Sequence, residues 1–240
     1  GKELWTDKKE GEPISIYSSY NEDDEARYVV GSIQNWVNQG RSLDEVAILY
    51  RSNAQSRVLE EAILRESLPY KIYGGLRFYE RAEIKNAMSY LRLLFGREDD
   101  AAFERVINIP PRGIGAKTID IIRAKAAEKS ISLWKSCEEL IDIEGLTPRA
   151  SQAIQGFMSS FNRLEDDTKD LQLRDLVDIT IERSGLIEYH KKESGEKGRT
   201  RVENLSELVG AARDFEPDSF NELEETALKL FIDHAALDAG

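Results

Sequence analysis

The residues best suited to chemistry form a segment rich in proline and glycine, residues 108–118, with the sequence Asn-Ile-Pro-Pro-Arg-Gly-Ile-Gly-Ala-Lys-Thr. Gly113 and Gly115 can adopt positive φ angles, which would let the backbone approach a ligand closely. Ile114, between them, would anchor such a turn in the core. Since predicted helices flank the segment, the pattern is typical of a helix–hairpin–helix. The alternative is a plain Pro/Gly turn between two core helices.

Charge and backbone amides give this hairpin an anion-binding character. The amides of residues 115–117 would lie at a helix N-terminus, where the helix dipole favours an anion. Arg112 and Lys117 add positive charge, and Thr118 can cap the helix or donate to a phosphate oxygen. A hairpin of this kind holds the DNA backbone without reading its sequence. We therefore predict a phosphate-binding site.

A second polar set, Arg51 and Asn53, follows an apolar run at residues 46–50. Ligands of open α/β sheets bind at the carboxyl ends of the strands. An arginine and an asparagine at that edge can hold phosphates or stack on the bases of a single strand. The alternative is a helix cap at Asn53 beside a surface arginine.

The glycine pair Gly74 and Gly75 connects the first third of the chain to the rest. Paired glycines absorb large dihedral changes, so this pair is a predicted hinge. A simple strand-to-helix turn is the alternative.

Several kinds of site are missing from the sequence. It contains no G-x-x-x-x-G-K-[ST] loop to hold nucleotide phosphates and magnesium. His190 and His234 are far apart in sequence and form no paired metal motif. The single cysteine, Cys137, excludes an internal disulfide and indicates a reducing compartment, which we take to be the cytoplasm.

The composition is that of a globular protein, with 240 residues, 40% hydrophobic and 32% charged. The net charge of −12 argues against a global basic field for nucleic acid, but cations cluster locally in residues 101–127. No apolar run approaches the roughly 20 residues of a membrane span, so we expect no membrane association. The chain does not begin with methionine, which indicates a piece of a longer protein.

Residues 1–73 alternate predicted strands and helices. Residues 14–17, 46–50 and 70–73 have strand-like composition, and apolar periodicity predicts helices over 22–37 and from Asn53 to about residue 63. This order predicts a partial parallel α/β unit of three strands. Residues 74–240 are predicted to be all-α, with a charged exposed loop at 193–200. The expected fold is therefore mixed α/β and mostly helical.

Five strings resemble motifs of the UvrD/PcrA/Rep-like superfamily I DNA helicases. Residues 48–61 resemble a signature of the second motor domain, and residues 73–85 resemble the motif that follows it. Residues 111–115 resemble the duplex-gripping hairpin of the mobile domain. Residues 198–205 and 234–237 also match, so the resemblance runs essentially end to end.

The resemblance implies an organisation. Residues 1–73 would be the first, incomplete part of the RecA-like motor domain 2A, and residues 74–240 most of the helical domain 2B inserted in it. The intact protein would be an ATP-dependent 3′–5′ helicase using ATP and Mg²⁺, with neither bound by this piece. No catalytic residue is expected here. By resemblance, Arg51 and Asn53 contact single-stranded DNA.

The duplex set implied by the resemblance is Gly113, Ile114, Gly115 and Thr118, with Arg112 and Lys117 as helpers. The expected partners are single-stranded and duplex DNA, 3′-tailed or forked, together with mismatch-repair and excision-repair proteins. Two rivals remain. The helical part could act mainly as an autoinhibitory or protein-docking module. Alternatively, the hairpin could belong to a base-excision glycosylase, which needs a catalytic lysine or aspartate after the hairpin, and Asp142 is the candidate for it.

Overall fold

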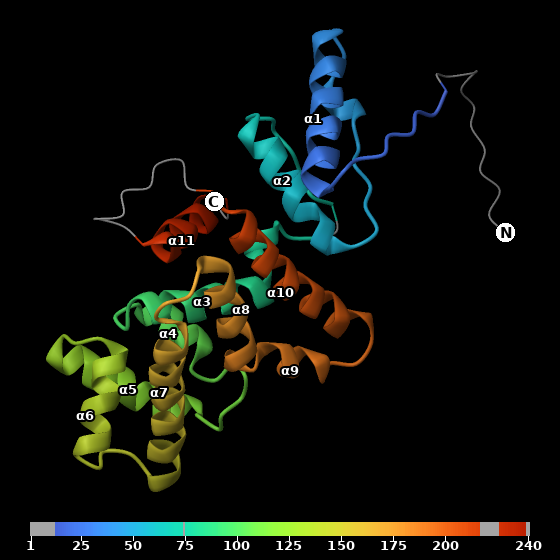
Figure 1. Cartoon of the computed structure of the whole chain (residues 1–240). Coiled ribbons are helices and arrows are strands. Elements are labelled where there is room, and N and C mark those ends of the chain that lie inside the picture. Colours follow the sequence, from blue (N-terminus) through green and yellow to red (C-terminus); the bar gives the residue numbers. More distant parts are fainter. Residues whose placement is uncertain (1–12, 74, 217–225, 239–240) are drawn as a thin grey trace.

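A computed structural model describes residues 13–73, 75–216 and 226–238. In these ranges the chain is built from α-helices and three short 3₁₀ helices, η1 to η3 (Figure 1). The helices are α1 (Glu22–Asn38), η1 (Leu43–Glu45), η2 (Asn53–Gln55), α2 (Ser56–Arg65), η3 (Phe78–Glu80), α3 (Ala82–Phe95), α4 (Asp100–Val106), α5 (Ala116–Lys129), α6 (Leu133–Asp142), α7 (Pro148–Thr168), α8 (Leu173–Ser184), α9 (Leu186–Lys191), α10 (Glu196–Asp214) and α11 (Ala227–Asp238).

The predicted three-stranded unit is wrong, because no residue of the described ranges lies in a strand. Segments 14–17, 46–50 and 70–73 are irregular, and no backbone hydrogen bond joins any of these segments to another. Ile14 and Leu49 are 95% and 93% exposed, although both were expected to be in a sheet. β-branched composition favours an extended backbone, but a strand also needs an aligned partner. These segments have no such partner here.

The predicted helices are largely confirmed. Apolar periodicity placed α1 within one residue of its observed end, and the segment predicted from Asn53 to about residue 63 is helical as η2 and α2. α10 begins at Glu196, inside the predicted 193–200 loop. Gly198 explains this early start, since a Cβ there would lie 2.6 Å from the carbonyl oxygens of His190 and Glu193. Residues 217–225, part of the region predicted to be all-α, lie outside the described residues.

Two hydrophobic clusters form the interior of the described chain. The smaller joins α1 to α2 through Ala26, Val30, Val58, Ala62 and Ile63. The larger is built on α3, which packs against α4, α8 and α10. Cys137 belongs to it and is fully buried, and burial raises the pKa of its thiol to about 12.

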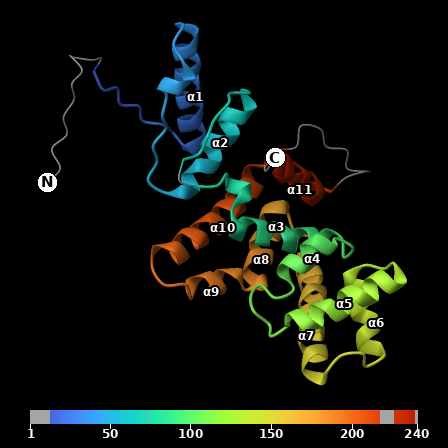
Figure 2. The same ribbon diagram turned by 180° about the vertical axis from the view of Figure 1, so that it is seen from behind.

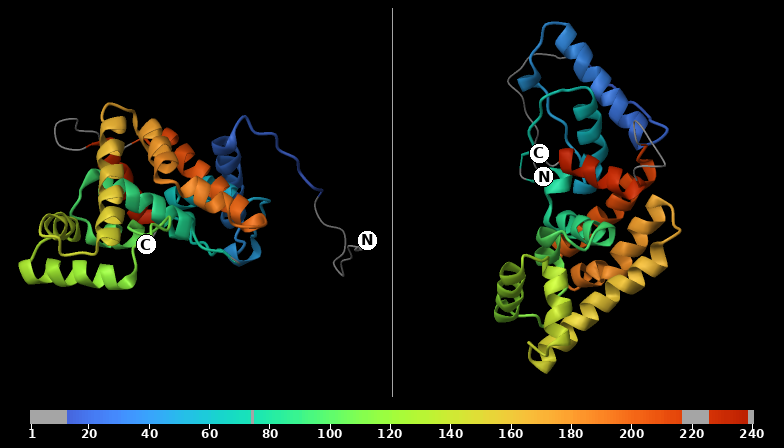
Figure 3. Two further views of the ribbon diagram at one scale, coloured as in Figure 1. Left: turned by 90° about the horizontal axis from the view of Figure 1, so that it is seen from below. Right: turned by 90° about the vertical axis from the view of Figure 1, so that its left-hand side faces the viewer.

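The helices are arranged around α10. Views from behind and from below place α5 and α6 at the opposite end of the molecule from α1 (Figures 2 and 3). α10 lies between these ends and contacts α3, α8 and α9, as well as the η2 turn before α2. In the described ranges, no helix combines the length and the apolar character that crossing a bilayer requires.

Candidate nucleic-acid interface

The hairpin of residues 107–115 connects α4 to α5 and is held in place by a buried side chain and by hydrogen bonds. Ile114 is 1% exposed, as expected of an anchor in the core. The hydroxyl of Tyr90, on α3, donates to the carbonyl oxygen of Ile109 at 2.7 Å. The amide of Arg112 donates to Oδ1 of Asn108 at 2.7 Å. Gly113 has a φ of +77°, which confirms that this position needs glycine.

The Arg112 side chain points into the hairpin rather than away from it. Its Nη1 donates to the carbonyl oxygens of Val106 and Pro110, both at 3.0 Å. Its Nη2 donates to the hydroxyl of Tyr90 at 2.5 Å, and the guanidinium lies over the ring of Phe157. Arg112 therefore ties the end of α4 to the hairpin, and both of its terminal nitrogens already have acceptors.

The start of α5 differs in detail from the prediction. Gly115 is the N-cap, with a φ of −83°, so its expected positive φ is wrong. Thr118 lies two residues into the helix and does not cap it; its amide donates to the Gly115 carbonyl oxygen at 3.0 Å. Ala116 and Lys117 are exposed, and no described residue accepts a hydrogen bond from their amides.

Apart from the modest preference for glycine at an N-cap, neither the backbone conformation nor the packing requires glycine at position 115. Its φ is open to any residue, and a Cβ added there would meet no atom within 4 Å. The small size of this residue leaves the amides of the first α5 turn uncovered. Close approach of an external group would explain the glycine.

Arg51 and Asn53 lie on the turn that leads into α2. Both are exposed. Ser52, not Asn53, is the N-cap of η2: its Oγ accepts from the amide of Ala54, and Oε1 of Gln55 accepts from the Ser52 amide at 3.0 Å. Ser52 Oγ also donates to Glu203 of α10 at 3.2 Å. The predicted pair thus sits on a turn that α10 supports.

Arg81 holds the same turn through a hydrogen bond to the backbone, a role that the sequence did not reveal. It is 8% exposed, and its Nη1 donates to the carbonyl oxygen of Asn53 at 2.8 Å and to Oδ1 of Asn204 at 3.1 Å. Burial lowers the pKa of Arg81, and the neighbouring Glu60 carboxylate opposes that shift. The only sequence signal was its place in the motif of residues 73–85.

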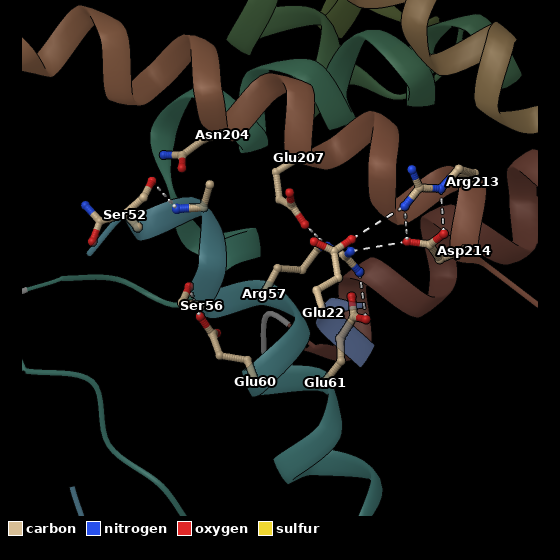
Figure 4. Close-up of polar contacts among 12 residues, drawn as sticks. Glu22, Ser52, Ser56, Arg57, Glu60, Glu61, Asn204, Glu207, Arg213 and Asp214 are labelled. Atoms are coloured by element: carbon tan, nitrogen blue, oxygen red, sulfur yellow. Dashed lines mark hydrogen bonds and ion pairs between the residues drawn. The ribbon is translucent and has the colours of Figure 1, made fainter. Parts of the chain in front are cut away.

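A buried ion network joins α2 to α10 (Figure 4). Arg57, 2% exposed, bonds Glu207 at 2.6 Å, Glu61 at 2.9 Å and Asp214 at 3.5 Å. Burial would lower the pKa of Arg57, but the Glu61 and Glu207 carboxylates raise it overall. Arg213 then holds Asp214 and reaches Glu22 of α1 at 3.5 Å.

The predicted hinge is only partly visible. Gly74 lies outside the described residues. Gly75 is exposed, and a Cβ on it would meet only Ile72, at 3.7 Å. The hinge stays a prediction.

The structure keeps the two predicted DNA-contacting sets in separate places. The 51–53 turn rests on α10, whereas the hairpin lies beside the α8–α9 junction, where a Cβ on Gly185 would be 3.6 Å from Pro110. Within the described ranges, no backbone hydrogen bond joins the two sets.

Comparison with known proteins completes these observations. The family model for the UvrD-like helicase C-terminal domain matches residues 1–240. The chain is 53% identical to DNA helicase II of Escherichia coli K12 over its whole length, and 52% identical to DNA helicase II of Salmonella typhimurium. It is 37% identical to the ATP-dependent DNA helicase PcrA of Staphylococcus epidermidis over 99% of its length.

The chain spans about a third of the length of these curated relatives. The match of the family model nevertheless covers every residue, including both sets of exposed polar groups described above. The chain therefore belongs to the UvrD-like helicase family, within the C-terminal domain of that family.

Proposed function

We propose that this chain is the DNA-contacting part of a longer ATP-dependent DNA helicase that moves 3′ to 5′. The family match and the names of the relatives support a helicase. The direction of movement, and a cellular role in mismatch and nucleotide-excision repair at the bacterial nucleoid, rest on the motif resemblance. Residues 1–73 would then belong to the motor domain 2A and residues 74–240 to the domain 2B.

ATP and Mg²⁺ would be held by other parts of the intact protein. This sequence has no phosphate-binding loop. Across the described ranges, no group of three or more His, Cys, Asp or Glu side chains could hold a metal ion. The residues present do not fit the nucleotide, and we assign none of them to it.

The observation that carries the proposal is the start of α5 at the hairpin. Ile114 is buried, Gly115 leaves open space, and the amides of Ala116 and Lys117 are free toward the outside. Oriented amides at the N-terminus of a 14-residue helix suit a phosphate oxygen. The Lys117 side chain adds a cation. Arg51 and Asn53 would contact the single-stranded tail.

Binding of a 3′-tailed duplex to the full chain, measured at several salt concentrations, tests this proposal. Each phosphate contact contributes about −0.9 to the slope of log affinity against log salt. Lys117→Ala should weaken duplex binding and make that slope shallower by about one such contact. Lys169→Ala, which removes an exposed lysine at the far end of α7, is the matched control.

Three outcomes are informative. A shallower slope for Lys117→Ala alone supports the hairpin. Equal slopes for both variants contradict it. A chain that binds no DNA but binds repair proteins would favour the docking alternative.

A further inference from the structure

Arg149 lies against the hairpin although it is far from it in sequence. It is the second residue of α7, after the capping Thr147 and Pro148. A Cβ on Gly113 would be 3.9 Å from Nη2 of Arg149, so this guanidinium stands beside the tip of the hairpin. Gly113 is required by its φ of +77° rather than by this contact, since a Cβ at 3.9 Å would be in ordinary van der Waals contact with the guanidinium.

Arg149 is free to bind a ligand. The residue is exposed, and no hydrogen bond or ion pair joins its side chain to any residue in the described parts of the chain. An exposed guanidinium has five donors in a planar fork that matches phosphate oxygens. It therefore offers an anion the geometry that Arg112, committed to carbonyl oxygens, cannot offer.

Apart from Lys117, the arginines and lysines of residues 101–127 already have partners. Arg105 bonds Asn86, Arg123 bonds Glu104 and Asp120, and Lys125 pairs with Glu128. Of the basic residues in 101–127, only Lys117 lacks a side-chain partner among the residues that the structure describes. Arg149 supplies a second free cation from another helix.

We propose that Arg149 is a phosphate-contacting residue of the duplex site, forming its second cation together with Lys117. This inference rests on the proposed function of the hairpin. A phosphate at the first α5 turn would meet the amides of Ala116 and Lys117. The Arg149 fork would hold an adjacent phosphate oxygen across Gly113.

The test compares Arg149→Ala with Arg163→Ala in the full chain. Arg163 is also exposed, lies on α7 roughly four turns away, and has no partner among the described residues. Affinity for a blunt duplex is measured between about 50 and 200 mM salt. Arg149→Ala should make the slope shallower by about 0.9, and Arg163→Ala should leave it unchanged.

Arg149→Lys separates charge from geometry. Lysine keeps the charge, so the slope should return to that of the parent chain, while affinity stays below it because the fork is lost. Thermal unfolding of each variant confirms that the fold is intact.

A parent-like slope and affinity in Arg149→Ala would overturn the assignment. The result for Lys117→Ala then shows which of the two assignments, Arg149 or the whole duplex site, is wrong. If Lys117→Ala alters the slope and Arg149→Ala does not, only the role of Arg149 fails. If neither alters it, the duplex site itself fails.

Discussion

Arg112 and Arg149 carry the same charge near the same turn, yet their surroundings give them opposite tasks. Arg112 donates to the carbonyl oxygens of Val106 and Pro110, whereas Arg149 has an open guanidinium beside Gly113. The local sequence favoured Arg112 because it is adjacent to the glycines. The direction of a side chain depends on packing partners such as Tyr90 and Phe157, which no local pattern contains.

Replacing Arg112 with lysine should destabilise the fold. A single ammonium cannot reach the carbonyl oxygens and the Tyr90 hydroxyl together. Hydrogen bonds from a charged donor contribute about 1.5–3 kcal/mol, so we expect the free energy of unfolding to fall by about 2 kcal/mol. Urea denaturation measures this loss. Arg123→Lys, at an exposed ion pair, should change little. Equal stability of the two variants would mean that Arg112 does not brace the hairpin.

Gly115→Ala should lower duplex affinity with little effect on folding. The added methyl group meets no protein atom, so any clash must come from a bound ligand. Alanine is a poorer N-cap than glycine, and we expect this difference to lower the free energy of unfolding by about 1 kcal/mol or less.

Gly156→Ala, within α7, is the control for this variant. Its Cβ also meets open space, and helix propensity predicts a gain of about 0.5–1 kcal/mol. Fluorescence anisotropy with labelled duplex compares the two. Unchanged duplex affinity in Gly115→Ala would mean that the duplex does not approach the open space beside Gly115.

At the scale of elements, periodicity predicted helices well and strands badly. A helix satisfies its backbone hydrogen bonds within one segment, so the apolar spacing of residues 22–37 was sufficient for α1. A strand depends on a partner elsewhere in the chain. The apolar run 46–50 indicates an extended backbone, yet here it lines an open cavity of about 1240 Å³ with Ile63 and Leu68.

The contact between α2 and α10 is the element-level feature with the clearest energetic consequence. Arg57 is buried against three carboxylates that remain partly exposed. Removing one member of a buried ion pair leaves the charge of its partner uncompensated. We expect Arg57→Met to lower the free energy of unfolding by about 3 kcal/mol. Arg65→Met, at the exposed end of α2, should have little effect.

A double-mutant cycle isolates the Arg57–Glu207 interaction. Arg57→Met combined with Glu207→Gln should lose less stability than the sum of the single variants, because each change already removes the shared bond. Additive losses would contradict a direct coupling. The cycle also bears on the predicted hinge, since any swivel that separates α2 from α10 must break this bond.

At the scale of the whole molecule, negative charge dominates, and binding depends on a few local cations. With a net charge of −12, the chain has no broad basic field. Lys117, Arg149 and Arg51 are the proposed contacts to a tailed duplex. At about 0.9 per duplex contact and 0.7 per single-strand contact, the salt slope should be about −2.5. A slope steeper than about −5 would require further cations in contact with the DNA, beyond Lys117, Arg149 and Arg51.

The buried anchor Ile114 also has a thermodynamic consequence. Because this side chain already lies in the core, the hairpin needs no folding step before it meets DNA. Coupled folding buries much apolar surface and gives a strongly negative heat-capacity change, whereas a preformed polar surface does not. Titration calorimetry with a duplex at several temperatures should therefore show an enthalpy that changes little with temperature. A steep dependence would mean that the hairpin becomes ordered only when it binds.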